Sequence, residues 1–171
     1  MKKYKRIFKE EQGRDWFTSD LHFDDDRLNL YGRDLVFNSK EDCANRIVEN
    51  FNNKIMPNDN LYIVGDVSFT LEGFEYLSRI NCKKFLIKGN YDDPTKTAKF
   101  DITDEFLSKY FDGVYDDLYK ILCNKEEVYI NHYPTNGKSD IFNVVGHIHG
   151  TWKVQRNMVN VGVDALITYL I

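Results

Sequence analysis

Six short runs of mostly apolar residues recur along this chain, and each one stops at Gly, Asp, Asn or His. β-Branched and aromatic residues dominate the runs, and their length and abrupt ends are typical of buried strands. The runs span residues 14–20, 60–66, 83–90, 126–132, 142–147 and 158–164. The stretch DLYKILCNKEEVYI (117–130) also has the pattern of a hairpin, with NKE as its turn.

Helical periodicity fills several of the gaps between these runs. Residues 39–55 begin with a capping box at Ser39, and their apolar positions form one face. Those positions are Cys43, Ile47, Val48, Phe51 and Ile55. Residues 70–80 repeat the pattern with Thr70 as the N-cap, and residues 103–111 predict a weaker third helix. Strands that alternate with helices predict an α/β protein with at least one largely parallel sheet.

The composition is that of one packed domain. The chain has 171 residues, of which 42% are hydrophobic and 15% aromatic, enough for a full core. We expect a single domain over residues 14–171, preceded by a charged extension at residues 1–13. No apolar stretch approaches the ~20 residues of a membrane span, and the first residues lack the apolar core of a secretory signal.

Charge and cysteine content exclude further classes of protein. The net charge is −4, with 23 basic and 27 acidic residues well mixed, so no basic face for extended nucleic-acid binding is expected. Cys43, Cys82 and Cys123 lie far apart and form no CxxC pair, which argues against a disulfide framework or a thiolate metal site. A cytoplasmic protein fits best. The sequence leaves the oligomeric state open.

Five of these runs end in a side chain that we take as a candidate metal ligand. These side chains are Asp20, Asp66, Asn90, His132 and His147. The carboxyl ends of strands in an open α/β sheet meet at one edge, so we expect the five to converge. The remaining two of the four histidines lie close by, because His22 follows Asp20 by two residues and His149 follows His147 by two.

The ligand types and spacing favour a pair of catalytic cations. Oxygen and nitrogen donors without sulfur suit Mn, Fe, Zn, Co or Ni. Residues two apart on an extended segment point the same way, and Gly146 and Gly150 allow the last loop to turn tightly. Seven ligands are too many for one tetrahedral site, but they suit two metals that share a carboxylate. Such a pair, ~3.5–4 Å apart, can clamp a phosphoryl group and lower the pKa of a shared water to roughly 7.

Five blocks of the sequence carry a family resemblance. They are SDLHF (19–23), VGDV (64–67), KGNYD (88–92), INHYP (130–134) and VVGHIHG (144–150). In this order they resemble the signature blocks of the calcineurin-like metallophosphoesterase superfamily. The small bacterial and phage phosphoesterases of that group are most similar, and they often end in a segment like VNVGVDA (159–165). The resemblance runs from Trp16 to Ala165 and implies a four-layer α/β/β/α sandwich of two mixed sheets, with a di-metal site on one edge.

The resemblance also implies which residues hold each metal. The ligands implied for the first metal are Asp20, His22 and His149. Those implied for the second are Asn90, His132 and His147. Asp66 would bridge both metals. The residues with implied catalytic roles are Asp66, Asn90, Tyr91 and Asp92.

Tyr91 departs from the family pattern. The fourth block of the family usually reads Gly-Asn-His followed by Asp or Glu, and its histidine is often assigned as the acid that protonates the leaving group. A tyrosine with a pKa near ~10 is a sluggish general acid at neutral pH. We therefore expect slow turnover, or a preference for leaving groups that need little protonation. Asp92 is expected to orient neighbouring groups by hydrogen bonds.

The expected function is hydrolysis of phosphomonoesters or phosphodiesters of a small molecule or nucleotide, with two divalent ions as cofactors and manganese foremost. The alternative is a non-catalytic metal-binding scaffold of the same fold. Arg27 and Arg33 follow the first block and either contact the substrate phosphate or lie on the surface. The run Asp24–Asp26 is interpreted as a solvated loop or helix start rather than a metal site.

Overall fold

The computed structural model describes residues 13–96, 102–122 and 125–165, which form two β-sheets and a set of helices. The first sheet is wholly parallel, with strand order β1-β2-β3-β4. Its strands are β1 (Asp15–Thr18), β2 (Asn60–Ile63), β3 (Lys83–Ile87) and β4 (Gly113–Tyr115). The second sheet is mixed, with order β5-β6-β7-β9-β8. Its strands are β5 (Leu118–Ile121), β6 (Glu127–Ile130), β7 (Phe142–Val145), β8 (Val154–Gln155) and β9 (Met158–Asn160).

All six predicted strands are present, each one ending before the polar residue that closes its run. The predicted hairpin is confirmed as the antiparallel pair β5 and β6, although its turn includes residues 123–124, which lie outside the described residues. Strands β4 and β8 were not predicted. They have three and two residues, too few to show an alternating pattern in the sequence.

Helix α1 (Lys40–Lys54) confirms the longest predicted helix. The Ser39 hydroxyl accepts the backbone N–H of Asp42 at 3.1 Å, as an N-cap should. The Asp42 carboxylate accepts the N–H of Asn38 instead of that of Ser39, so only half of the capping box forms. The buried face of α1 holds Cys43, Ala44, Ile47 and Val48.

The second predicted helix is a 3₁₀ helix, η3 (Glu72–Arg79), and not an α-helix. Its apolar residues recur every third position, which matches the 3₁₀ repeat of three residues per turn. These residues are Leu71, Phe74, Leu77 and Ile80. The Thr70 hydroxyl still accepts an N–H at the start of the segment, from Gly73 at 3.1 Å. The third predicted helix shrinks to α2 (Asp104–Leu107), capped by Thr103.

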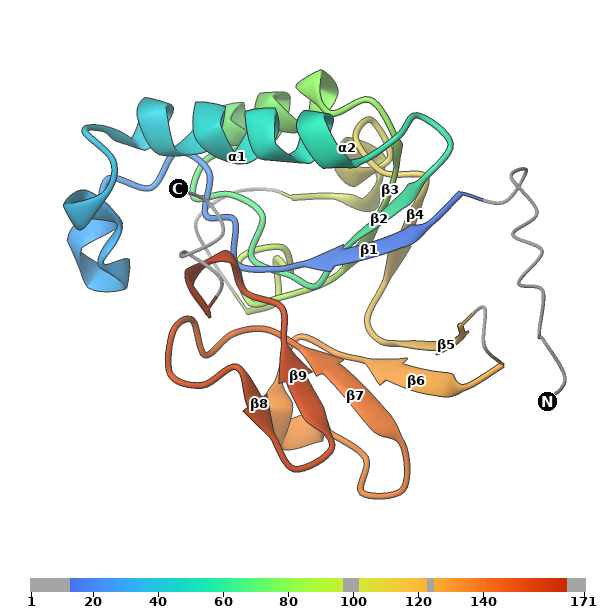
Figure 1. The fold of residues 1–171 in the computed structure, drawn as a ribbon. Helices are drawn as coiled ribbons and strands as arrows, with labels where there is room; N and C mark the ends of the chain where they lie inside the picture. Colours follow the sequence, from blue (N-terminus) through green and yellow to red (C-terminus); the bar gives the residue numbers. More distant parts are fainter. Residues whose placement is uncertain (1–12, 97–101, 123–124, 166–171) are drawn as a thin grey trace, which may run out of the picture.

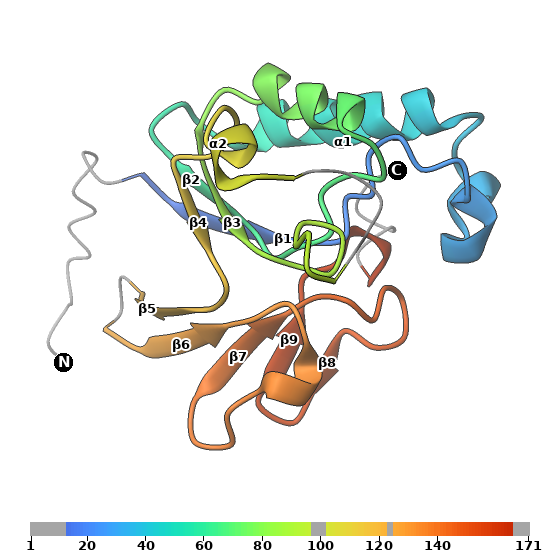
Figure 2. The same cartoon turned by 180° about the vertical axis from the view of Figure 1, so that it is seen from behind.

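The elements form layers around two apolar cores. Helices α1 and η3 cover one face of the first sheet, while the second sheet faces its other side (Figure 1 and, from behind, Figure 2). The larger core lies between the helices and the first sheet and includes Ile47, Leu77 and Leu61. The smaller core includes Val64, Ile130 and Val144. These layers confirm a mixed α/β fold with one parallel sheet.

The predicted extension at residues 1–13 lies outside the described residues except for Gly13, and so does the end of the predicted domain after Ala165. Within the described part of the chain, no helix has the length and apolar character needed to cross a bilayer.

Candidate metal centre

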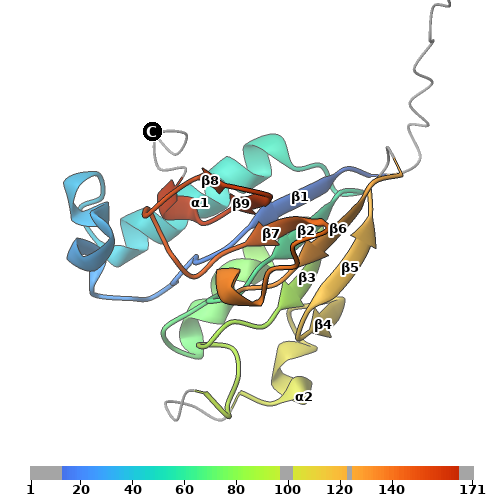
Figure 3. The ribbon, with the colours of Figure 1, turned by 90° about the horizontal axis from the view of Figure 1, so that it is seen from below.

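The two sheets meet where several of their strands end. The backbone N–H of Ser19, just after β1, donates to the carbonyl of Val161, just after β9, at 3.0 Å. The carbonyl of Ser19 in turn accepts the N–H of Val163 at 3.1 Å. Figure 3 shows the second sheet lying across the first, so loops from both sheets line one edge. The predicted site residues lie in these loops.

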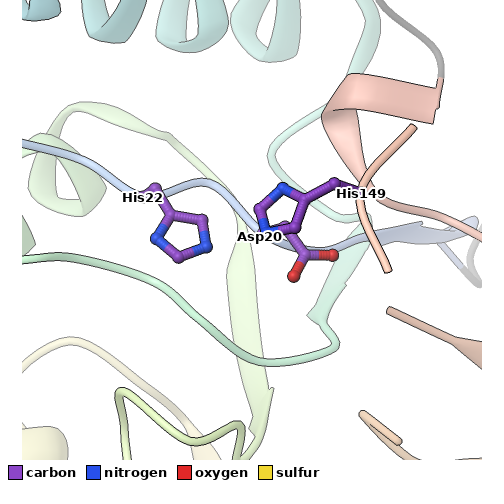
Figure 4. Close-up of side chains that lie close together, drawn as sticks. All are labelled: Asp20, His22 and His149. Atoms are coloured by element: carbon purple, nitrogen blue, oxygen red, sulfur yellow. The ribbon is translucent and has the colours of Figure 1, made fainter. Parts of the chain in front are cut away.

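Asp20, His22 and His149 form a first cluster, whose ligand atoms all lie within 4.8 Å of one another. Asp20 and His22 follow β1, whereas His149 follows β7 in the other sheet, and the three side chains converge (Figure 4). Asp20 and His22 are buried. The Asp20 carboxylate also accepts the backbone N–H of His147, at 3.1 and 3.0 Å to its two oxygens, which fixes the loop after β7 against the loop after β1.

Asp66, His132 and His147 form a second cluster with the same spread of ligand atoms. Asp66 follows β2 in the first sheet, while His132 and His147 follow β6 and β7 in the second. The Asn90 amide oxygen, at the end of β3, lies 3.1 Å from Nδ1 of His147. All seven predicted ligands are therefore brought together, and each cluster combines residues of both sheets.

The Asp66 carboxylate lies between the two clusters. Its Oδ2 atom is 3.6 Å from Nε2 of His22 and 3.4 Å from Nε2 of His132. Its Oδ1 atom accepts the backbone N–H of Tyr91 at 3.0 Å. This is the position that a carboxylate shared by two cations needs.

Buried imidazole nitrogens in this region lack hydrogen-bond partners. Within the described part of the chain, the buried side-chain nitrogens and oxygens without a partner are Nδ1 and Nε2 of His22 and Nε2 of His132. Burying such a group unpaired costs about 1–3 kcal/mol. A divalent cation at each cluster would take the one lone pair of His22 and the one of His132. The donor set of carboxylate, imidazole and amide suits borderline or hard ions. The residues therefore fit a pair of divalent metals.

The backbone at the site departs from the predicted extended geometry. Five of the seven residues have positive φ angles in the left-handed region. They are Asp20 (56°), His22 (45°), Asp66 (56°), His147 (74°) and His149 (48°). The predicted extended backbone was wrong at these residues. Asp20 and His22 nevertheless enter one cluster, and His147 and His149 reach the two neighbouring clusters, as expected. Left-handed geometry costs roughly 1–2 kcal/mol per non-glycine residue, so the fold stores strain here.

Burial and charge shift the pKa values of the clustered groups. Burial lowers the pKa of His22 to about 3. Burial also lowers that of His132, but the adjacent Asp66 carboxylate outweighs it and raises the pKa to about 9. The buried Asp20 carboxyl has a raised pKa for want of solvation. In the metal-free protein the site thus mixes neutral and charged imidazoles around the carboxylates.

Asp92 supports the second cluster from behind. It is fully buried and accepts three backbone N–H groups, from Asp66 at 2.7 Å, Gly89 at 2.9 Å and Val67 at 3.0 Å. Burial, together with the charge of Asp66, raises the pKa of Asp92 to about 6. The predicted orienting position of Asp92 is therefore found at the backbone of the loops after β2 and β3.

Tyr91 lies beside the first cluster, in an edge-to-face arrangement with His22 whose ring centroids are 5.1 Å apart. Its hydroxyl accepts a hydrogen bond from Nη2 of Arg27 at 3.1 Å. Arg27 is fixed by Asp25, which accepts from Nε at 2.8 Å and Nη2 at 2.7 Å, and its guanidinium lies 4.3 Å over the Phe69 ring. Tyr91 thus lies beside the first cluster within a cationic and aromatic wall.

Two interpretations of charged residues need correction. Asp25 is buried at 1% exposure because it pairs with Arg27 and lies 3.7 Å from Nδ1 of His22, so the acidic run is not simply solvated. Arg33, 2% exposed, is neither on the surface nor available to a phosphate, because Asp164 occupies its guanidinium at 2.6 and 3.0 Å.

Asp164 is a site residue that the sequence interpretation missed. It follows β9 and its Oδ2 atom lies 2.6 Å from Nδ1 of His149. The sequence pattern could have identified it, because Asp164 closes the apolar run 158–164 just as Asp66 and His147 close theirs.

Comparison with known proteins shows the fold alone. No family model matches the chain, and no curated protein matches it. The crystal structure of a protein of unknown function from Aquifex aeolicus is similar, with a TM-score of 0.63 and 22% sequence identity over 92% of this chain and 98% of that one. The chain therefore shares its fold with an uncharacterised bacterial protein.

Proposed function

We propose that this protein is a di-metal phosphoesterase that hydrolyses phosphomonoesters or phosphodiesters of a small molecule or nucleotide. The observation that supports it is the Asp66 carboxylate, which lies 3.6 and 3.4 Å from unpartnered ring nitrogens of His22 and His132. Membership of the calcineurin-like metallophosphoesterase superfamily, its four-layer α/β/β/α sandwich and a cytoplasmic location belong to the same proposal.

Each cluster would hold one cation. The ligands of the first are Asp20, His22 and His149, and those of the second are Asn90, His132 and His147, with Asp66 shared. Two divalent ions, manganese foremost and iron, zinc, cobalt or nickel as alternatives, supply an activated water and neutralise charge on the phosphoryl oxygens when bound.

The residues around the clusters would position the substrate and its protons. The Tyr91 hydroxyl accepts from Arg27, so its own proton can be directed to a substrate oxygen. Arg27 is 37% exposed and can add a contact to a phosphate oxygen from its solvent side. A phenol gives up its proton reluctantly at neutral pH, which favours substrates with good leaving groups such as aryl esters or phosphoanhydrides.

The second candidate function is a non-catalytic metal-binding scaffold. Tyr91 is the observation that favours it, because a tyrosine replaces the histidine that the family pattern uses for proton donation. The seven intact ligands favour the enzyme.

Turnover of metal-stripped protein tests the proposal directly. The protein is reloaded with Mn²⁺ and assayed on bis-p-nitrophenyl phosphate and p-nitrophenyl phosphate, alongside His147→Ala. All four histidines belong to the clusters, so the control is Tyr119→Ala, an aromatic residue on β5 that is 52% exposed. We expect Mn²⁺-dependent hydrolysis that His147→Ala abolishes and Tyr119→Ala retains.

The diester-to-monoester ratio in this assay would give the substrate class. Two metals bound per chain without turnover would support the scaffold instead. Failure of the wild-type protein to bind metal would refute both.

A further inference from the structure

A buried chain of hydrogen bonds backs the first cluster. Nδ1 of His149 lies 2.6 Å from Oδ2 of Asp164, and Arg33 donates to both oxygens of that carboxylate, at 2.6 Å from Nε and 3.0 Å from Nη2. The three residues come from the loop after β7, the loop after β9 and the 3₁₀ helix η2 (Arg33–Leu35). Segments far apart in the sequence thus meet behind one ligand.

Arg33 also contacts the loop that carries the other two members of this cluster. Its Nη2 donates to the carbonyl of Asp20 at 2.6 Å, and its Nη1 donates to the carbonyl of Leu21 at 2.8 Å. One guanidinium therefore joins the backbone of a carboxylate ligand to the side chain that contacts His149. Planar bidentate geometry of this kind fixes orientation as well as charge.

Tyr31 completes the support. It belongs to the 3₁₀ helix η1 (Leu28–Tyr31), next to η2 in the chain. Its ring stacks on the His149 ring with centroids 4.3 Å apart. The Arg33 guanidinium carbon lies 5.1 Å from the centroid of the Tyr31 ring. The segment from η1 to η2 is consequently a wall against which His149 packs.

The chemistry of the contact assigns the proton on His149. A carboxylate can only accept, so Nδ1 of His149 carries the hydrogen and Nε2 keeps its lone pair for a cation. Arg33 donates to both oxygens of Asp164, which fixes this carboxylate as an acceptor facing His149.

The second cluster has a neutral support. Nδ1 of His132 lies 2.7 Å from the carbonyl oxygen of Val64, whereas Nδ1 of His147 lies 3.1 Å from the amide oxygen of Asn90, which is itself a candidate ligand. A charged carboxylate raises the basicity of a histidine ligand more than a carbonyl does. The two clusters therefore differ in how strongly their imidazoles are supported.

We propose that Asp164 and Arg33 are positioning residues for the cation at Asp20, His22 and His149, and that they set the tautomer and orientation of His149. This inference rests on the proposed di-metal site. It assigns Asp164 and Arg33 to one of the two cations. A substitution at either residue should therefore change the affinity of that metal position and leave the other unchanged.

Asp164→Asn tests the inference, because it keeps the shape of the side chain and removes the charge. The matched control is Asp59→Asn, the same change at a carboxylate that is also buried but accepts from Arg14, Trp16 and Met56 at the other end of the first sheet. Mn²⁺ titration by calorimetry counts bound ions, and electron paramagnetic resonance distinguishes a coupled Mn²⁺ pair from an isolated ion. Neither readout requires activity.

We expect Asp164→Asn to lose about 10–100-fold in affinity at one of two positions and to give the spectrum of an isolated ion at limiting Mn²⁺. Asp59→Asn should bind two ions as the wild type does. Ring-nitrogen NMR of the four histidines in metal-free protein should show His149 as the Nδ1–H tautomer in the wild type and a changed mixture in Asp164→Asn. If Asp164→Asn does not fold, Arg33→Lys should show a smaller loss at the same position.

Wild-type affinity at both positions in the folded Asp164→Asn variant would overturn the inference while leaving the proposed function standing. Equal weakening of both positions would also overturn it, because the residues would then act on the whole fold. A wild-type protein that binds no Mn²⁺ pair would overturn the inference together with the proposed function.

Discussion

The buried carboxylate of Asp92 accepts the backbone N–H of Asp66 at 2.7 Å. Asp92 thereby holds the backbone of the residue whose own carboxylate lies between the two clusters. The Asp92 carboxylate also accepts the N–H of Gly89 at 2.9 Å, so one side chain ties together the loops after β2 and β3. Asp92 therefore fixes the backbone from which both Asp66 and Asn90 project.

Asp92→Asn should destabilise the metal-free protein by about 1–3 kcal/mol, because an amide has one acceptor oxygen for three N–H donors and turns its own N–H₂ toward at least one of them. Urea unfolding measures this change. Mn²⁺ affinity should fall as well, since Asp66 loses its anchor. A variant as stable as the wild type would show that the three hydrogen bonds contribute nothing net.

Tyr91→His should restore proton donation to the leaving group. On alkyl phosphate esters, which need protonation, we expect the rate to rise by ~10²-fold or more. On p-nitrophenyl esters the rate of Tyr91→His should change little, and Tyr91→Phe should have a similar rate. On alkyl esters Tyr91→Phe should show no gain in rate. Steady-state kinetics on both classes tests this, and a Tyr91→His variant no faster on alkyl esters would contradict it.

Gly89→Ala should disturb the bridging carboxylate directly. A Cβ atom at Gly89 would lie 2.4 Å from Oδ1 of Asp66, well inside contact distance. Gly150→Ala is the control, because the nearest atom to its Cβ would be 3.7 Å away although it neighbours His149. Calorimetric titration with Mn²⁺ should show weakened binding in Gly89→Ala and wild-type binding in Gly150→Ala. Weaker binding in Gly150→Ala than in Gly89→Ala would contradict the role of Asp66 as a shared ligand.

Asp59→Asn should flatten the loss of stability in acid. Burial raises the pKa of Asp59, but N–H groups of Met56, Arg14 and Trp16 outweigh it and hold the pKa below its ordinary value. A carboxyl with a depressed folded-state pKa stabilises the protein above its unfolded-state value of ~4 and loses that contribution as the pH falls further. Unfolding free energies of metal-free protein measured down to pH ~3 should therefore fall more steeply in the wild type than in the variant. If the unfolding free energy falls equally steeply with pH in both proteins, Asp59 does not contribute to the loss of stability in acid.

The strand pattern predicted that the ligands converge at one edge of the sheets, but not the backbone conformation of the residues that carry them. Asp66 and His147 could be found because each ends an apolar run, and parallel strands deliver such residues to one edge. The left-handed φ angles could not be found, because non-glycine residues rarely adopt them and the sequence carries no signal for the strain.

The contact between Arg33 and Asp164 was beyond sequence reasoning for a different reason. The two residues are 131 positions apart, and their contact exists only once η2 docks against the end of β9. For an arginine that follows a block of candidate metal ligands, the sequence left two explanations open, substrate contact and surface charge. Tertiary packing gives Arg33 a third role, the ion pair with Asp164. The 3₁₀ form of η3 was not predicted either, because the i, i+3 spacing of Phe74 and Leu77 also occurs on one face of an α-helix.

Each cluster takes residues from both sheets, and this has a consequence for the order of events during biosynthesis. A chain in which only the first sheet has formed presents Asp20 and His22 but lacks His149, and one with only the second sheet presents His132 and His147 but lacks Asp66. Neither half offers a complete set of ligands. Under the proposed di-metal function, a cation would therefore bind only after the two sheets have docked, and a partly folded chain would hold the wrong ion poorly.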